Sequence, residues 1–334
     1  MAGPDFFIIG APKAGTTALH AALARHPDLY LSPVKEPKYF MCDGPPPRRQ
    51  HRGPGDAHSR NEWIWRREQY EALFGAAPPG VPRGESTPFY LYDRRAQRRI
   101  RRDVPHARLV AILRDPVDRA YSNWMHLRSD GLEPEADFLA ALRLEPHRKR
   151  TGYAPFWHYR GLGLYGEQLE HLFGLFPREQ VHVLRYRDLV DRPQGALDDV
   201  CAFLGVAHLE ASPPAPENVK PYVGAGARND LLRRAVRVGA SVGQLFPPDV
   251  WRKVSVPVID ALHAAGTSRP RLSERQRGQA IELFAEDVAR LERIEGRPFH
   301  GWLDATDRGS FVSRATPGRP GLGDGPAPAG PTGS

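Results

Sequence analysis

The first two dozen residues constrain the fold of this chain more than any other stretch. A short apolar run, Phe6–Ile9, precedes a turn bounded by glycines, Gly10–Gly15, and then a segment that fits the first turns of a helix, Thr16–Leu23. Such a run is typical of a buried parallel strand. In this order, backbone N–H groups and the helix dipole favour an anion in the loop, and Lys13 adds a positive charge. The stretch therefore predicts a phosphate-binding loop.

This loop differs from the P-loop of nucleoside-triphosphate enzymes in the place of its lysine. In that motif a lysine directly follows the second glycine, whereas here Thr16 holds that position and Lys13 lies inside the loop. The most apolar strand candidate, Leu109–Leu113, is followed by Arg114 rather than by an acid that could bind Mg²⁺. We therefore expect anion binding without a metal. A P-loop kinase and a plain strand-to-helix turn with an exposed lysine are the alternatives.

Apolar runs of strand length alternate with helical patterns along most of the chain. Strand patterns cover 6–9, 30–31, 81–92, 108–113 and 181–185, and helical patterns cover 17–25, 94–102, 116–124, 163–176, 193–204, 229–238 and 274–295. With a phosphate loop after the first strand, this alternation predicts an α/β fold. We expect a P-loop-like, three-layer structure with a central, mostly parallel sheet flanked by helices.

The helical and strand patterns predict a single domain over residues 1–305. Two polar segments, 42–62 and 128–157, interrupt them and are interpreted as insertions. The last segment, 306–334, is rich in glycine and proline and is expected to be disordered, because it cannot bury a core.

The composition limits the classes of binding partner and the compartment that we expect. A net charge of +8 at pH 7 favours anionic partners such as a nucleotide, an acidic glycan or nucleic acid. A nucleic-acid-binding protein would need a recognition module or interleaved aromatics, which the sequence lacks. No apolar run approaches the roughly 20 residues of a membrane span, and the N-terminus has no leader pattern, so we expect a cytoplasmic protein. Cys42 and Cys201 lack metal-ligand spacing, which argues against a zinc site.

Arg114 and Ser122 form a second candidate anion site. Arg114 follows a strand and Ser122 lies two turns into the helix that comes next. At the carboxyl end of a parallel sheet, a guanidinium and a hydroxyl could hold a phosphate together. Equally, Arg114 could pair with Asp115 or Asp118, and Ser122 could be a buried helix serine. The spacing alone does not decide between these alternatives.

Several segments, in order, carry a resemblance to a known family. They are Pro12–Leu19, Lys35–Phe40 and Leu113–Ser122, followed by Gly161–Pro177 and Leu283–Leu291. Over residues 5–303 the chain resembles the PAPS-dependent sulfotransferases, in the branch of heparan sulfate N- and O-sulfotransferases and their bacterial relatives. The resemblance implies transfer of a sulfuryl group from 3′-phosphoadenosine 5′-phosphosulfate (PAPS) to a hydroxyl or amine, without a metal.

The resemblance also implies roles for single residues. The 5′-phosphosulfate would be held by Lys13, Ala14, Gly15, Thr16 and Thr17. Arg114 and Ser122 would hold the 3′-phosphate, which favours the binding alternative for that pair. Glu36 matches the general base of this branch, and Lys13 would stabilise the leaving phosphate. Alternatively, Glu36 is a surface acid between Lys35 and Lys38, which would either lower its pKa or contact an anionic acceptor.

The chain departs from the family pattern in two places. Some relatives have a lysine where this chain has Ser86. The family's late basic glycine loop, which closes over the nucleotide, is only loosely matched by residues 218–228, with Lys220 and Arg228 as candidates. A conventional closing loop is therefore a weaker expectation than the first phosphate site.

The acceptor is expected to be a carbohydrate or a small molecule such as a natural product. Both insertions, 42–62 and 128–157, would lie on its side of the molecule. Aromatic residues in or beside them are Trp63, Trp65, Trp157 and Tyr159. These side chains would either stack on a sugar or aryl acceptor or anchor the small core of an insertion. The sequence predicts no oligomeric state.

Overall fold

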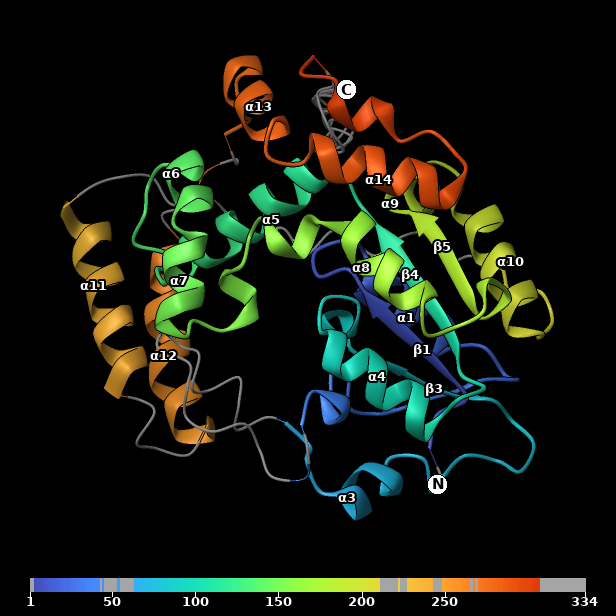
Figure 1. Cartoon of the computed structure of the whole chain (residues 1–334). Helices are drawn as coiled ribbons and strands as arrows, with labels where there is room; N and C mark the ends of the chain where they lie inside the picture. Colours follow the sequence, from blue (N-terminus) through green and yellow to red (C-terminus); the bar gives the residue numbers. More distant parts are fainter. Residues whose placement is uncertain are drawn as a thin grey trace, which may run out of the picture.

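The computed structural model describes residues 3–42, 44, 53–54, 63–210, 222, 227–242, 248–264, 267 and 270–306. At its centre lies a five-stranded sheet (Figure 1), made of β1 (Phe6–Gly10), β2 (Tyr30–Leu31), β3 (Arg83–Ser86), β4 (Arg108–Leu113) and β5 (Val181–Arg185). The strand order is β2-β3-β1-β4-β5, and each neighbouring pair is parallel. The predicted α/β fold with a central parallel sheet is confirmed.

Helices cover the sheet and extend beyond it. They are α1 (Thr16–Leu23), α3 (Arg67–Ala72), α4 (Arg94–Asp103), α5 (Pro116–Ser129), α6 (Phe138–Arg143), α7 (Glu145–Thr151), α8 (Tyr165–Phe173), α9 (Tyr186–Asp191), α10 (Pro193–Leu204), α11 (Ala227–Val242), α12 (Pro248–His263), α13 (Glu274–Ile281) and α14 (Ala285–Glu295). In Figure 1, α4 and α8 lie over one face of the sheet, and α6, α7, α11 and α12 form a group to its side.

The two central strands, β1 and β4, fix the start of the loop that follows β1. Both are buried along nearly their whole length, as their continuous apolar runs predict. Their register shifts between Ile8 and Gly10. The Ala11 N–H then donates to the carbonyl oxygen of Ile112 at 2.8 Å. The loop therefore leaves the sheet while still hydrogen-bonded to the neighbouring strand.

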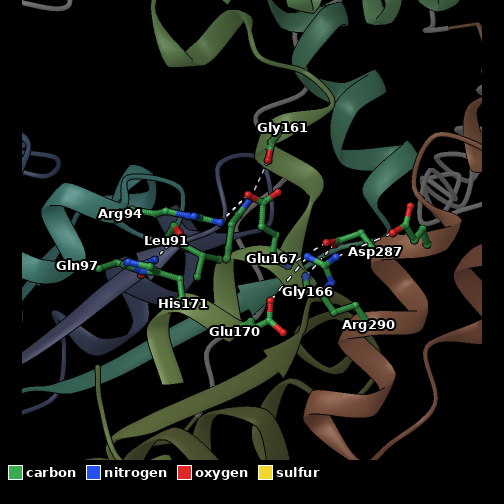
Figure 2. Close-up of polar contacts among 12 residues, drawn as sticks. Leu91, Arg94, Gln97, Gly161, Gly166, Glu167, Glu170, His171, Asp287 and Arg290 are labelled. Atoms are coloured by element: carbon green, nitrogen blue, oxygen red, sulfur yellow. Dashed lines mark hydrogen bonds and ion pairs between the residues drawn. The ribbon is translucent and has the colours of Figure 1, made fainter. Parts of the chain in front are cut away.

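Helix α8 forms polar contacts with both α4, which lies over the sheet, and the C-terminal helix α14 (Figure 2). The Asp287 carboxylate of α14 accepts hydrogen bonds from the backbone N–H groups of Gly166 and Glu167, at 2.8 and 2.9 Å. An acid at a helix N-terminus is favourable because it neutralises the helix dipole. On the other side, Glu167 pairs with Arg94 of α4 at 2.6 Å. The C-terminal part of the chain is in this way held against the sheet layer.

One helical prediction needs correction, and other helices were not predicted. The single helix predicted over 274–295 is wrong: α13 and α14 are separated by a turn at residues 282–284, which buries Phe284. Segment 128–157 contains α6 and α7, whose Phe138 and Leu142 are buried. Helix α12 was not predicted; it contains Pro257, a residue that is unfavourable inside a helix. Most of segment 42–62, and the tail after Thr306, lie outside the described residues.

Candidate functional site

The candidate site lies where the connections from the two central strands diverge. The chain leaves β1 towards β2 on one side, and it leaves β4 towards β5 on the other. Crevices at such switch points, at the carboxyl ends of parallel strands, are where open α/β sheets bind ligands. A hydrogen bond joins the two loops there, from the Nη1 of Arg114 to the carbonyl oxygen of Lys13 at 3.2 Å. The two predicted anion sites are thus adjacent.

Helix α1 begins in a way that suits an anion. Its N-cap, Gly15, has a left-handed backbone with φ of 93°. Among the described residues, α1 has neither a side-chain N-cap nor an acid in its first turn. The N–H groups of Thr16 and Thr17 also have no partner within the helix, because the first turn lacks preceding carbonyls. An oxyanion would satisfy these groups and face the positive end of the helix dipole.

Arg114 is held in place by an aromatic ring. It is only 6% exposed, and its guanidinium carbon lies 4.7 Å from the centre of the Tyr186 ring. Asp115 and Asp118, the aspartates named as structural partners for it, both bind Arg277 of α13, the second at 2.9 Å. The role of Arg114 stays a prediction. Ser122 is buried on α5, as its structural alternative predicted.

The segment with Glu36 lies next to the end of β3. The Glu36 N–H donates to the Ser86 carbonyl at 2.9 Å. Its carboxylate, 29% exposed, pairs with the Lys35 ammonium at 2.6 Å. In the described part of the chain, three residues other than glycine have positive φ: Lys13 at 68°, Glu36 at 63° and Lys38 at 58°. Such strained backbones occur mainly at functional sites, and two of these three were predicted as catalytic.

A buried carboxylate, that of Glu85, is connected to the segment after Glu36 through hydrogen-bonded hydroxyl groups. Glu85 accepts hydrogen bonds from the hydroxyls of Tyr70 and Thr87, the second at 2.7 Å. The Thr87 and Tyr90 hydroxyls accept the backbone N–H groups of the segment after Glu36, at 3.4 and 3.3 Å. Burial raises the pKa of Glu85 to about 7. The Glu85 side chain is fully buried.

His20 is a site residue that sequence reasoning missed. It lies on α1, and its Nδ1 forms a hydrogen bond with the Ser86 hydroxyl at 2.8 Å. Burial, together with the nearby charge of Lys35, lowers the pKa of His20 to about 4. The ring is therefore neutral at physiological pH, beside both Ser86 and Glu36. Its position one turn after the glycine loop was the only signal in the sequence.

The acceptor-side aromatics divide into two groups. Trp157 and Tyr159 are buried in the core, which supports the packing alternative for both. Trp63 is nearly buried and lies 5.7 Å from the Lys38 ammonium, measured to the ring centre, so it contacts the segment after Glu36. Trp65 is half-buried.

The side chains of both candidates for the closing loop, Lys220 and Arg228, lie outside the described part of the structure. Lys220 lies outside the described residues. Arg228 is the second residue of α11, and its side chain is also outside the described part.

Comparison with known proteins decides the family. The sequence model described as "Sulfotransferase family" matches residues 4–210, which include both strand ends and the Glu36 segment. The chain belongs to the sulfotransferase family. The family match confirms the resemblance inferred from the three motifs and the expected class of enzyme. It also covers every candidate site residue except Lys220 and Arg228.

Individual sulfotransferases agree with this assignment. A crystal structure of a sulfotransferase from Alicyclobacillus acidocaldarius is 31% identical, with a TM-score of 0.68, over 90% of this chain and 99% of that one. Human bifunctional heparan sulfate N-deacetylase/N-sulfotransferase 3 is 30% identical over 90% of this chain and 31% of its own length. Human heparan sulfate glucosamine 3-O-sulfotransferase 6 is 30% identical over 62% and 53%. The chain thus spans less than two thirds of these curated relatives.

Among the helices in the described part of the chain, none has the length and apolar character to cross a membrane. The compartment remains a prediction from the sequence.

Proposed function

We propose that this sulfotransferase moves the sulfuryl group of PAPS to a hydroxyl or amine of a glycan or small-molecule acceptor. The observation that supports the proposal is that three elements lie together at the carboxyl ends of the sheet strands. These are the glycine loop with Lys13, the strand end with Arg114, and the segment with Glu36. Two of them carry left-handed, non-glycine backbones at the residues that the chemistry needs.

The donor would be held at both of its phosphate ends. Backbone N–H groups at the start of α1, together with Lys13, suit the 5′-phosphosulfate. Arg114 suits the 3′-phosphate because a guanidinium offers a planar fork of donors. Its contact with the Lys13 carbonyl links the two ends, so that occupation of one phosphate site fixes the residues of the other. Tyr186 keeps the guanidinium oriented from behind.

The reaction is an in-line displacement at sulfur. A lone pair of the acceptor oxygen or nitrogen forms the new bond to sulfur, while the bond from sulfur to the bridging phosphate oxygen breaks. The acceptor proton passes to the Glu36 carboxylate, and the charge left on the 5′-phosphate is neutralised by Lys13 and the N–H groups of α1. The products are the sulfated acceptor and 3′-phosphoadenosine 5′-phosphate (PAP).

Two residues lie beside the proposed base Glu36: uncharged His20 and positively charged Lys35. The Lys35 ammonium contacts the Glu36 carboxylate at 2.6 Å and places a positive charge beside the proposed base. His20 is uncharged at physiological pH, because burial lowers its pKa to about 4. Ser86 connects both residues, through its carbonyl to Glu36 and through its hydroxyl to His20.

An amino sugar is the first acceptor to try. The curated relatives are named for N-sulfation and 3-O-sulfation of heparan sulfate glucosamine, so a glucosamine unit offers both an amine and a hydroxyl. Small aryl and aliphatic alcohols form the second group of acceptors. The segment that carries Glu36 also carries Lys38, which would attract an anionic group on either kind of acceptor.

Transfer of radiolabelled sulfate from PAPS to a panel of these acceptors tests the proposal. We expect Glu36→Gln to bind the donor with unchanged affinity and to lose transfer by about 10²- to 10⁴-fold, the usual contribution of a general base. The matched control is Glu68→Gln, an exposed acid on α3. Wild-type transfer rates in Glu36→Gln would refute the role of the base, and absence of transfer with every acceptor class would refute the proposed activity.

A further inference from the structure

A second charged cavity lies away from the sheet edge, between α11 and the end of α5. Its volume is about 370 Å³, and four of its lining residues are arginines: Arg128, Arg233, Arg234 and Arg237. In the described lining there is a single carboxylate, that of Asp230. Figure 1 shows α11 at the outer margin of the group that it forms with α6, α7 and α12, apart from the sheet, so this cavity is distinct from the proposed donor site beside β1.

The arginines are directed to the cavity by the backbone. Three come from α11, where Arg237 lies three residues after Arg234 and four after Arg233, the spacings at which helical side chains are neighbours. The fourth, Arg128, ends α5 and donates from Nη1 to the Glu133 carbonyl at 3.0 Å. Arg237 donates from Nη1 to the Gly131 carbonyl at 3.2 Å. The turn after α5 therefore accepts hydrogen bonds from two of these guanidinium groups.

The electrostatic balance of this cluster is unfavourable in the empty protein. Arg233 is 1% exposed and pairs with Asp230 at 3.0 Å. Burial, and then the charge of Arg233, lower the pKa of both Arg128 and Arg237. Arg234 is exposed and forms no hydrogen bond or ion pair with another described residue. The four positive charges outnumber the two carboxylates that act on them, Asp230 and Glu133, and a multivalent anion would relieve the remaining repulsion.

We propose that this cavity binds a ligand that carries two or more clustered phosphate or sulfate groups. Guanidinium groups suit such ligands because their planar forks match two oxygens of one oxyanion. Several arginines on one rigid helix face suit a ligand with more than one oxyanion. The inference does not depend on the reaction proposed for the sheet edge.

The alternative is that the arginines only attach α11 to the turn after α5. Hydrogen bonds to the Gly131 and Glu133 carbonyls account for Arg237 and Arg128 in that case. They do not account for Arg234, whose side chain makes no such bond with the described residues. A structural role predicts that removing Arg234 leaves both stability and anion binding unchanged. A binding role predicts loss of anion binding alone.

Titration calorimetry with inorganic pyrophosphate, in the presence of saturating PAP, tests the proposal. We expect one saturable site in the wild type, weakened at least about tenfold in Arg234→Gln/Arg237→Gln, since hydrogen bonds to charged groups are lost. The matched control, Arg95→Gln/Arg98→Gln on α4, removes the same net charge from an exposed helix face and should keep the site. Arg234→Gln alone covers the case in which the double variant fails to fold.

Further arms identify the ligand and separate the two sites. Sucrose octasulfate is the sulfate-bearing probe: binding at the same arginines favours a sulfated ligand, and binding of pyrophosphate alone favours a diphosphate. Lys13→Ala should keep pyrophosphate binding, so a failure of the donor site would not be mistaken for a failure of this cavity. The proposal is overturned if neither probe shows saturable binding, or if both double variants weaken binding equally.

Discussion

The stability of this protein should depend on pH through Glu85, and the structure gives the size of the effect. Burial raises the pKa of Glu85 from 4.5 to about 7, against the opposing hydrogen bonds from Tyr70 and Thr87. A carboxyl with a raised folded pKa holds its proton more tightly in the folded state, so stability falls as pH rises from 4.5 through about 7. One pKa unit corresponds to about 1.4 kcal/mol, and the full loss is therefore about 3 kcal/mol.

Urea unfolding of wild type and Glu85→Gln, followed by circular dichroism between pH 5 and 8, measures this loss. Glutamine has the shape of the protonated carboxyl but does not titrate. The difference between the two proteins therefore isolates Glu85. We expect the free energy of unfolding of the wild type to fall by about 2.5 kcal/mol relative to the variant between pH 5 and pH 8, because the unfolded carboxyl is already partly ionised at pH 5. Exposed Glu68→Gln should follow the wild type. A difference that stays constant with pH would refute the reasoning.

Two further predictions follow from the first turns of the chain. Burial lowers the pKa of His20 to about 4, so protonation destabilises the folded state as pH falls below 6.5. In urea titrations at pH 7 and 4.5, His20→Gln should lose less stability on acidification than the wild type. An equal loss in both proteins would contradict this prediction. Gly15→Ala should lower the melting temperature more than Gly80→Ala. Both positions have left-handed φ, but only the methyl group added at position 15 would approach Tyr186, at 2.9 Å. Equal decreases in melting temperature would contradict the close packing of the loop.

Local sequence signals predicted the sheet and its loop well. Apolar runs identified β1, β4 and β5, and even the two-residue β2 was placed correctly. These runs are readable because strands of a parallel sheet are buried on both faces and need apolar side chains throughout. The glycine loop was readable for the same local reason, since its backbone needs glycine at the left-handed position of Gly15.

Features that depend on contacts between distant segments were not readable. Glu85 is one residue of a strand in the sequence, and only the fold brings Tyr70 and Thr87 to its oxygens. His20 looks like an ordinary helix residue until Ser86 and Lys35 come next to it. The stacking alternative for Trp157 failed because burial, which decides between stacking and packing, is a property of the tertiary structure.

The break between α13 and α14 has a similar cause. The periodic pattern over 274–295 continues through the turn, so the sequence predicts one helix. In the structure the turn allows Arg277 on α13 to reach Asp115 and Asp118 of α5 while α14 packs on α8. Two tertiary requirements thus override the helical pattern, as commonly happens when local propensity is the weaker term.

Binding of PAP to wild type and Lys13→Ala, measured by thermal unfolding beside ATP with Mg²⁺, tests the central claim most directly. Linkage predicts that PAP at about 100 times its dissociation constant stabilises the wild type by about 2.7 kcal/mol. We expect this stabilisation to be clearly smaller in Lys13→Ala, and ATP with Mg²⁺ to have little effect on either protein. No stabilisation by PAP, or an equal stabilisation by ATP with Mg²⁺, would contradict the assignment of the glycine loop to a phosphosulfate donor.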